Sequence, residues 1–250
     1  MTRRTIGILG GMGPLATADL YTKIIQATPA NSDQEHLPVI IHADPSVPDR
    51  TAALLSGGED PTPWLVRGAS NLASAGAEFI VMPCNTAHAF IEQVQDECPI
   101  PIVNMIDEAA REVQSLVPRG ASAGILATGG TVAAGLYQSA LERHGLQYLT
   151  PGADGQSLVM ETIRRVKAGK IDPETVQPVL AAVRELEDAG AAALLAACTE
   201  LPVVLRQDLA GVPLIDPTDV LARAAVRIST SDDAWIALLT DTGKVRSHVN

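Results

Sequence analysis

Residues 7–20 read GILGGMGPLATADL, and this stretch decides the class of fold. An apolar run stops at a glycine-rich turn, and a helical pattern follows the turn. Strand, glycine turn and helix in this order open a βαβ unit of a parallel sheet. The turn also matches the dinucleotide-binding pattern G-x-G-x-x-A at Gly11, Gly13 and Ala16. This match is short, so the rest of the chain has to decide whether the loop binds a nucleotide.

The same order of elements occurs a second time in the chain. AGILATGGTVAAGLYQSAL at residues 123–141 resembles the first unit, and the glycines of the two GIL runs, Gly7 and Gly124, are 117 residues apart. The cysteines of MPCNTAH and AACTELP are 114 residues apart, and the prolines of IPIV and VPLI are 112 apart. Strand-like runs alternate with helical stretches in both halves. The chain is therefore predicted to form two similar doubly wound α/β domains with parallel sheets, related by pseudo-twofold symmetry with a cleft between them.

These landmarks also set the expected domain boundaries. Residues 1–103 together with 215–230 form the first domain, because the helical stretch after VPLID can return to it. Residues 104–214 form the second domain. Residues 231–250 fit neither repeat and are expected to form an exposed C-terminal extension.

Composition limits the kinds of partner. The net charge is −11, and no basic or aromatic-rich patch offsets it, which argues against nucleic-acid binding. Apolar residues make up 46% of the chain, but they occur in short blocks, far from the roughly 18 uninterrupted apolar residues of a membrane span. The N-terminal MTRRTIGIL passes into a strand without an export cleavage site. The expectation is a cytoplasmic protein that binds a small molecule and has no membrane or nucleic-acid partner.

Two of the three cysteines occupy equivalent places in the repeat. Cys84 follows the run EFIVM and Cys198 follows AALLAA, each at the carboxyl end of a predicted strand and just before a helix, where ligands gather in α/β sheets. A helix N-terminus is expected to lower the pKa of such a thiol. Cys98, in DECPIP, has no counterpart and is predicted to be a packing residue. With no C-x-x-C pair or Cys/His cluster, no metal site is predicted.

Two opposed thiols suit the inversion of a carbon stereocentre without a cofactor. One thiolate can remove a proton from one face of the carbon while a thiol delivers a proton to the other face. Asn85, Thr86 and Thr199, with the nearby helix-start N–H groups, could stabilise the developing negative charge. The competing interpretation is that each cysteine only packs behind its strand.

Several motifs follow one another in the order typical of a known family. They are GGMGPLAT, DQEH, PDRT, GEDP, MPCNTAH, VKAG, CTE and PLIDP, within about residues 5–228. Through them the chain resembles the aspartate/glutamate racemase superfamily, and most closely its cofactor-independent aspartate racemases. The resemblance implies an active site between two α/β domains, a small dicarboxylic amino acid as substrate, no cofactor, and a homodimer.

The resemblance also implies roles for individual residues. Cys84 and Cys198 would be the catalytic acid/bases. Arg50 in PDRT and Lys167 in VKAG would hold the side-chain carboxylate of the substrate, one as a bidentate fork and one as a point charge. The α-carboxylate would be held by Asn85, Thr86, Thr199 and the backbone around Met12.

Some of these residues have structural alternatives. Arg50 can pair with Asp49, and Lys167 can be a solvated lysine at a helix end. Glu200 stands where glutamate racemases of the superfamily usually have a histidine, which favours the aspartate branch. Glu200 either tunes Cys198 or caps the first helical turn. 

Three further residues in these motifs have no assigned chemistry. His88 lies one helical turn after Cys84, and a core histidine is at least as consistent with this position as a functional one. Glu35 and His36 in DQEH are typical of the family, but no chemical role follows from their residue types.

Other functions remain open at this point. A racemase or isomerase of the same superfamily could act on glutamate, a hydantoin or maleate, whereas a decarboxylase that keeps one cysteine is disfavoured because both are present. An NAD-dependent oxidoreductase is disfavoured because Pro14 stiffens the turn and no acidic residue follows a second strand at the usual spacing. A non-enzymatic protein that closes on an amino acid is the third possibility.

Overall fold

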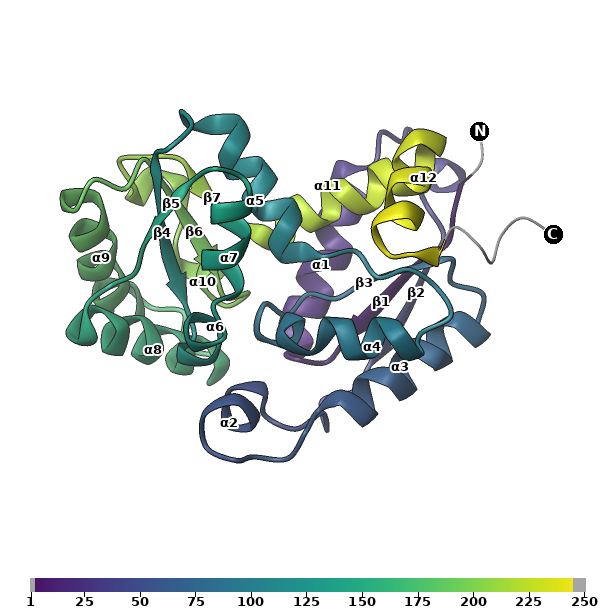
Figure 1. The fold of residues 1–250 in the computed structure, drawn as a ribbon, viewed down its shortest axis with the longest axis horizontal. Coiled ribbons are helices and arrows are strands. Elements are labelled where there is room, and N and C mark those ends of the chain that lie inside the picture. Colours follow the sequence, from purple (N-terminus) through teal and green to yellow (C-terminus); the bar gives the residue numbers. More distant parts are fainter. Residues whose placement is uncertain (1–2, 245–250) are drawn as a thin grey trace. The chain divides into compact units, whose positions relative to one another are not determined.

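The computed structural model describes residues 3–244, and the chain divides into two compact units. Each unit is built on one parallel sheet with helices packed on it (Figure 1). The predicted α/β class with two parallel-sheet units is confirmed. Unit 1 comprises Met1–Pro48, Asp60–Met105 and Leu221–Asn250, and unit 2 comprises Asp49–Glu59 and Ile106–Val220.

The sheet of unit 1 contains three parallel strands in the order β2-β1-β3. These are β1 (Ile6–Gly10), β2 (Val39–Ala43) and β3 (Phe79–Val81). Ile80 also forms an isolated parallel bridge with Ile102, where a further strand was predicted at IPIVN. The helical elements that pack in this unit are α1 (Pro14–Ala27), η1 (Asp33–Glu35), α3 (Thr62–Ser74), η2 (Thr86–Phe90), α4 (Ile91–Glu97), α11 (Pro217–Thr230) and α12 (Asp232–Asp241).

The sheet of unit 2 contains four parallel strands in the order β5-β4-β6-β7. These are β4 (Ser122–Ala127), β5 (Gln147–Leu149), β6 (Ala193–Ala197) and β7 (Leu214–Ile215). The remaining helical elements are α2 (Arg50–Leu55), α5 (Met105–Leu116), α6 (Gly129–Ala133), α7 (Leu136–Arg143), α8 (Ala153–Lys167), α9 (Pro173–Asp188), α10 (Leu201–Val204) and η3 (Gln207–Leu209).

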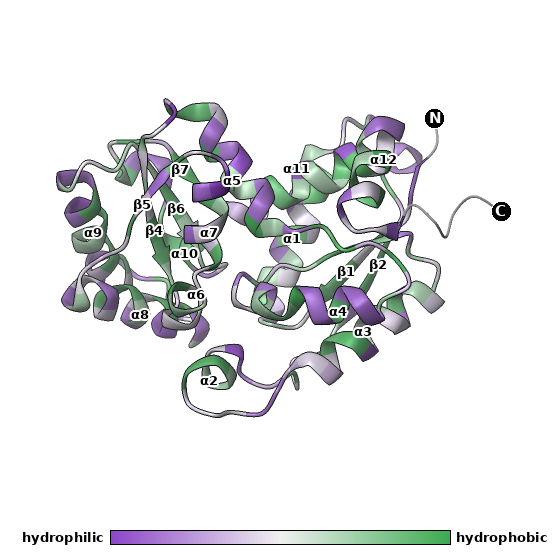
Figure 2. Cartoon of the chain, in the orientation of Figure 1, coloured by the Kyte–Doolittle hydropathy of each residue, from purple (hydrophilic) through white to green (hydrophobic). Residues whose placement is uncertain are grey.

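The inner strands of both sheets are buried on both faces: successive residues of β1 and β4 point to opposite sides, and helices cover each side. In unit 1, Ile8 packs with apolar residues of α1, α11 and α12, and Leu9 packs with residues of α3. In unit 2, Ile125 packs with α5 and α7, and Leu126 packs with α8 and α9. Figure 2 shows this pattern as hydrophobic central strands between helices that carry both hydrophobic and hydrophilic residues.

The strand order repeats between the units, as the duplicated motifs predicted. β4, β5 and β6 follow the same order as β1, β2 and β3, with the first strand of each unit at the centre. β7 pairs with β6 in unit 2, and the Ile102 bridge takes the corresponding place beside β3 in unit 1. The residues that follow β3 and β6 therefore lie at equivalent positions in two similar sheets.

The division into units differs from the expected boundaries in three internal segments, of which the shortest, residues 104–105, belongs to unit 1 instead of unit 2. Asp49–Glu59, which lies between two elements of unit 1 in the sequence, belongs to unit 2 because α2 packs on α6. Residues 215–220 also belong to unit 2, where Ile215 in β7 pairs with Leu195 in β6.

The segment predicted to be an exposed extension contains a packed helix instead. Leu238 and Leu239 of α12 are buried, and the Trp235 ring lies 6.3 Å from the Phe79 ring. The Arg4 guanidinium pairs with Asp232 and lies 5.0 Å from the Trp235 ring centroid. The prediction is wrong for α12, because these contacts make the helix part of the unit 1 core; residues 245–250 lie outside the described residues.

Within residues 3–244, no helix is both long and apolar enough to cross a membrane.

Candidate active site

Cys84 lies in a tight segment at the carboxyl end of β3. The Cys84 N–H donates to the Met82 carbonyl, 2.9 Å away, and the chain then enters η2. The Cys84 side chain is 6% exposed, and the neighbouring Asn85 and Thr86 are also buried. A thiol, an amide and a hydroxyl thus follow β3 at the carboxyl edge of the unit 1 sheet, where α/β proteins bind their ligands.

His88 is fixed by hydrogen bonds to backbone groups on both sides of its ring. Its Nδ1 lies 2.9 Å from the carbonyl oxygen of Cys84, and its Nε2 accepts a hydrogen bond from the Met105 N–H, 3.1 Å away. Burial lowers the pKa of His88 to about 4, although hydrogen bonding to the backbone of Cys84 and Val103 opposes this shift. His88 is therefore a core histidine that holds the segment containing Cys84.

Cys198 occupies the equivalent position in unit 2, directly after β6. It is 6% exposed, and Thr199 beside it is buried to the same degree. The Cys198 thiol donates to Glu200, with 2.9 Å between Sγ and Oε2, and the Thr199 hydroxyl lies 3.3 Å from the same oxygen. Of the two roles considered for Glu200, the geometry favours direct interaction with Cys198 over capping of α10.

Charges of opposite sign act on the Cys198 thiol. Burial raises the pKa of Cys198 well above its usual range, the negative charge of Glu200 and its hydrogen bond raise it further, and Lys167 lowers it. The backbone of Glu200, at the start of the next helix, does lower the pKa of Cys198 as predicted, but the expected net lowering is wrong for this thiol. The helix that follows, α10, has only four residues, and desolvation of the thiol outweighs its effect.

The two predicted cationic residues both belong to unit 2. Lys167 is the last residue of α8 and is exposed, and its charge reaches Cys198. Arg50 is the first residue of α2, whose N-terminus is capped by the Asp49 side chain accepting from the Ala52 N–H at 2.7 Å. Asp49 thus orders the helix that presents Arg50.

Met12 lies in the loop between β1 and α1, and its side chain is buried in the core of unit 1. The N–H groups of this loop were expected to approach a substrate carboxylate. The Gly11 N–H instead donates to the Thr17 hydroxyl at 2.9 Å, and that hydroxyl lies 3.1 Å from the Gly13 carbonyl. The Gly11 N–H is therefore used by Thr17 to close the turn on α1.

The predicted site residues therefore fall into two groups, one in each unit. Cys84, Asn85 and Thr86 are consecutive residues of unit 1, and Met12 lies in another loop of the same unit. Unit 2 contains Cys198, Thr199 and Glu200, Lys167 whose charge acts on Cys198, and Arg50 on α2.

Neither Tyr137, whose electrostatic neighbours include Cys198, nor Asp216, which also acts on Tyr137, was singled out from the sequence. Tyr137 of α7 is fully buried, and its pKa is raised well above the usual range by burial, then by the charges of Asp216 and Cys198. Asp216 directly follows β7, the strand beside β6, and its carboxylate accepts from the Thr218 N–H at 2.8 Å. The signal was available for Asp216, since it stands at a strand's carboxyl end just as Cys198 does.

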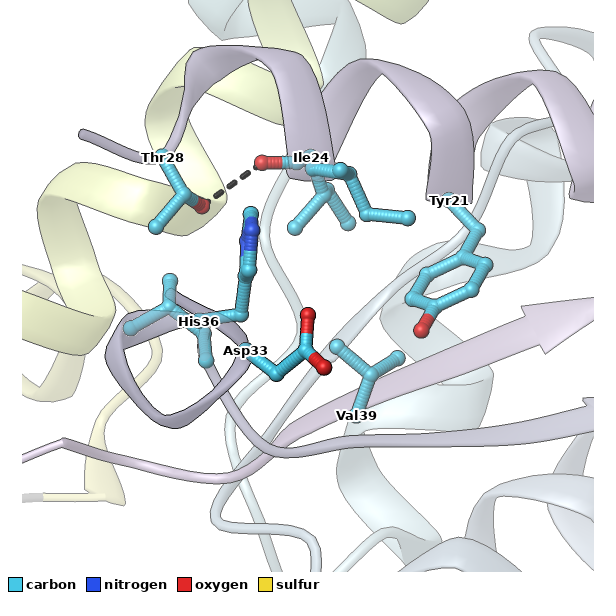
Figure 3. A pocket seen from close by; sticks show the side chains of 8 residues that line it. Tyr21, Ile24, Thr28, Asp33, His36 and Val39 are labelled. Carbon is cyan, nitrogen blue, oxygen red and sulfur yellow. Dashed lines mark hydrogen bonds between the residues drawn. The ribbon is translucent and has the colours of Figure 1, made fainter. Parts of the chain in front are cut away.

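The DQEH motif has a structural role in unit 1. The Glu35 carboxylate accepts from the Asn31 N–H at 2.6 Å, and the Arg3 guanidinium donates to the Gln34 carbonyl at 2.6 Å. Asp33 and His36 lie beside Ile24 of α1 and Thr28, which follows α1, in a pocket of about 340 Å³, shown in Figure 3. None of the predicted site residues lines this pocket.

Cys98 directly follows α4 and is 1% exposed within the apolar core of unit 1. Burial raises the pKa of its thiol. The prediction of a packing cysteine is confirmed.

The chain is similar to amino-acid racemases over nearly its whole length. A family model described as Asp/Glu/Hydantoin racemase matches residues 9–225. The broad specificity amino-acid racemase RacX of Bacillus subtilis is 27% identical over 227 residues, which cover 88% of this chain and 96% of that protein. A glutamate racemase of Desulforudis audaxviator is 31% identical over 163 residues, which cover 62% of this chain and 57% of that protein.

A solved structure agrees with this result. The Picrophilus torridus aspartate racemase has a TM-score of 0.75 and 32% sequence identity, covering 96% of this chain and 94% of that chain. The matched family region includes the residues around both Cys84 and Cys198. The chain therefore belongs to the Asp/Glu/Hydantoin racemase family.

Proposed function

We propose that this protein racemises aspartate without pyridoxal phosphate, with Cys84 and Cys198 as the two acid/bases. The observation that carries the proposal is the equivalence of these two thiols. Each is 6% exposed and follows the third strand of its sheet, and each is followed within two residues by a buried threonine. Packing alone does not require a cysteine at the same place in both repeats.

The reaction needs two proton transfers at Cα. One cysteine, as thiolate, takes the α-proton, so that the C–H bond breaks and an S–H bond forms. The other cysteine, as thiol, gives its proton to the opposite face, so that its S–H bond breaks and a new C–H bond forms. The proton has then moved from one cysteine to the other, which is the state required for the reverse reaction. The raised pKa of Cys198 favours its thiol form, which suits the proton donor.

Recognition of a dicarboxylate requires cations. Arg50 and Lys167 hold the side-chain carboxylate in this proposal, and Glu200 tunes the protonation of Cys198. The groups that hold the α-carboxylate, and so stabilise the negative charge that develops beside Cα, are Asn85, Thr86, Thr199 and the backbone around Met12. The similarity to the Picrophilus torridus aspartate racemase over 96% of this chain supports aspartate as substrate.

A broader substrate range is the second candidate. The relatives include a racemase named for broad specificity and a glutamate racemase. An extra methylene in the substrate changes transition-state binding by only about 1–3 kcal/mol, so glutamate is the natural competitor of aspartate.

The test is hydrogen exchange at Cα in D₂O. The purified protein, with no added cofactor, is incubated with each enantiomer of aspartate, glutamate and a set of neutral amino acids, and loss of the α-proton signal is followed by NMR together with chiral chromatography. We expect solvent deuterium in racemised aspartate, and loss of racemisation in Cys84→Ser and in Cys198→Ser. Full activity in either variant contradicts the two-thiol mechanism. Calorimetric binding of aspartate without exchange indicates a binding protein instead.

A further inference from the structure

The ring of His88 connects two backbone groups of unit 1. One is the carbonyl of Cys84, 2.9 Å from Nδ1, and the other is the N–H of Met105, 3.1 Å from Nε2. Met105 is the first residue of α5, so its N–H has no partner within its own helix and needs one from elsewhere. His88 is 3% exposed, and water has little access to these bonds.

The hydrogen bond from the Met105 N–H favours one tautomer of the neutral ring. A backbone N–H can only donate, so Nε2 must be the unprotonated acceptor, and the proton of the neutral ring then lies on Nδ1. Nδ1–H in turn donates to the Cys84 carbonyl. The pKa of about 4 keeps His88 neutral above mildly acidic pH, and both bonds persist there.

We propose that His88 is a positioning residue for Cys84, which holds the carbonyl of the catalytic cysteine and thereby the direction of its thiol. This inference rests on the proposed racemase function for the role of Cys84. Cys84 follows a strand of only three residues and precedes a 3-10 turn, so these local elements hold its backbone less firmly than a long strand or helix. A displacement of about 1 Å in a reacting group can slow a reaction roughly 100-fold.

Two substitutions test the two hydrogen bonds of the His88 ring one at a time. The side-chain amide of asparagine reaches about as far as Nδ1, so His88→Asn can keep a donor for the Cys84 carbonyl while losing the acceptor for Met105. The amide of glutamine reaches about as far as Nε2, so His88→Gln can accept from Met105 while losing the donor to Cys84. Each variant removes one hydrogen bond from the same buried place.

The variants should differ in turnover although they lose similar contacts. We expect kcat of His88→Gln to fall by roughly 10- to 100-fold with KM for aspartate changed less than about twofold. His88→Asn should retain most of the wild-type kcat. Circular dichroism and thermal unfolding establish that both variants are folded at the assay temperature.

Isotope effects with α-deuterated L- and D-aspartate distinguish positioning from general damage. When Cys84 is poorly placed, cleavage of the α-bond becomes more limiting for the enantiomer from which Cys84 removes the proton, and the primary isotope effect rises. For the other enantiomer, proton delivery by Cys84 limits the rate, and the effect falls toward one. A variant that only reduces the amount of folded protein leaves both isotope effects unchanged.

A measurement without substrate keeps this inference separate from the proposed function. Alkylation by iodoacetamide is followed at Cys84 and Cys198 by mass spectrometry, with Cys198 as the internal reference. In His88→Gln we expect Cys84 to react about threefold faster or more relative to Cys198, because the segment loses its anchor and the thiol becomes more accessible. The alkylation measurement gives a result even if the wild-type protein does not exchange the α-proton of any amino acid tested.

The control is His144, which is also bonded at both ring nitrogens, to Gln114 and to Asp107 at 3.2 Å each. His144→Asn and His144→Gln should leave the isotope effects and the alkylation ratio unchanged. The positioning role is overturned if the His88 variants have equal kcat and wild-type isotope effects, or if the Cys84 alkylation ratio in His88→Gln equals that of wild type.

Discussion

The Cys198 thiol donates a hydrogen bond to the carboxylate of Glu200, with 2.9 Å between Sγ and Oε2. A thiolate at this position would lose that bond and stand beside a negative charge, so the carboxylate stabilises the protonated thiol. The ammonium group of Lys167 acts in the opposite direction. The protonation of Cys198 is thus set by burial together with the balance between one anion and one cation.

Replacement of Glu200 by glutamine tests the effect of the nearby anion on the pKa of Cys198. Glu200→Gln keeps an oxygen that can accept from the thiol but removes the negative charge, so the pKa of Cys198 should fall. The pH profile of Cys198 alkylation by iodoacetamide, followed by mass spectrometry, should move to lower pH. The profile of Cys84 in the same sample serves as the reference. A Cys198 profile that stays in place or moves upward would contradict this role of Glu200.

Removal of the Lys167 charge should have the opposite effect. Without the nearby cation the thiolate is less stable, so the pKa of Cys198 should rise in Lys167→Gln and its alkylation profile should move to higher pH. Lys167→Arg should keep the wild-type profile. Lys170→Gln, a change of an exposed lysine three residues further on, controls for the loss of a general surface charge. Equal profiles for both glutamine variants would show that Lys167 has no specific influence on the thiol.

The fold and the position of both thiols could be predicted because they depend on local patterns. Alternating strand-like and helical stretches require parallel sheets, and the repeat places Cys84 and Cys198 after corresponding strands. The parallel order β2-β1-β3 and its copy β5-β4-β6 agree with this reasoning. Both thiols lie at the carboxyl ends of strands: Cys198 directly follows β6, and Cys84 lies three residues after the end of β3.

Other features depend on contacts between residues far apart in the chain. The membership of Arg50 in unit 2 depends on the packing of α2 against α6, about 80 residues later in the sequence. Packing of α12 depends on Arg4 and Phe79 meeting Trp235. The pKa of Cys198 depends on burial and on the orientation of Glu200, neither of which is encoded in a short motif.

The buried histidine should make unit 1 sensitive to acid. The pKa of His88 is about 4 in the folded protein and 6.5 in its ordinary state, so between these values the unfolded chain binds a proton that the folded chain does not. Stability from this group is complete above pH 6.5 and is lost as the pH falls toward 4, by on the order of 3 kcal/mol. We expect urea unfolding to show this loss in wild-type protein and a shallower pH dependence in His88→Asn.

The fluorescence of Trp64 and Trp235 follows this unfolding, since both of the chain's tryptophans belong to unit 1. Carboxylates that titrate in the same pH range are present in both wild type and His88→Asn, so their contributions to the pH dependence of stability cancel in the comparison. Parallel stability curves for wild type and His88→Asn between pH 6.5 and 4 would contradict a depressed pKa for His88.

The glycine turn after β1 should tolerate no side chain at Gly11. Two effects contribute, the strain of a positive φ and a clash with the backbone of Asp44, and a comparison with Gly76 separates them. Gly11 has φ +97, and a Cβ there would lie 2.4 Å from the carbonyl carbon and oxygen of Asp44. Gly76, also in unit 1, has φ +100, and its Cβ would meet nothing within 4 Å. We expect Gly76→Ala to lower the free energy of unfolding by about 1–2 kcal/mol through backbone strain alone. Gly11→Ala should lower it by about 3 kcal/mol or more, because the backbone of Asp44 must also move. Urea unfolding monitored by tryptophan fluorescence measures both changes, and equal losses would mean that the turn can shift away from Asp44 without cost.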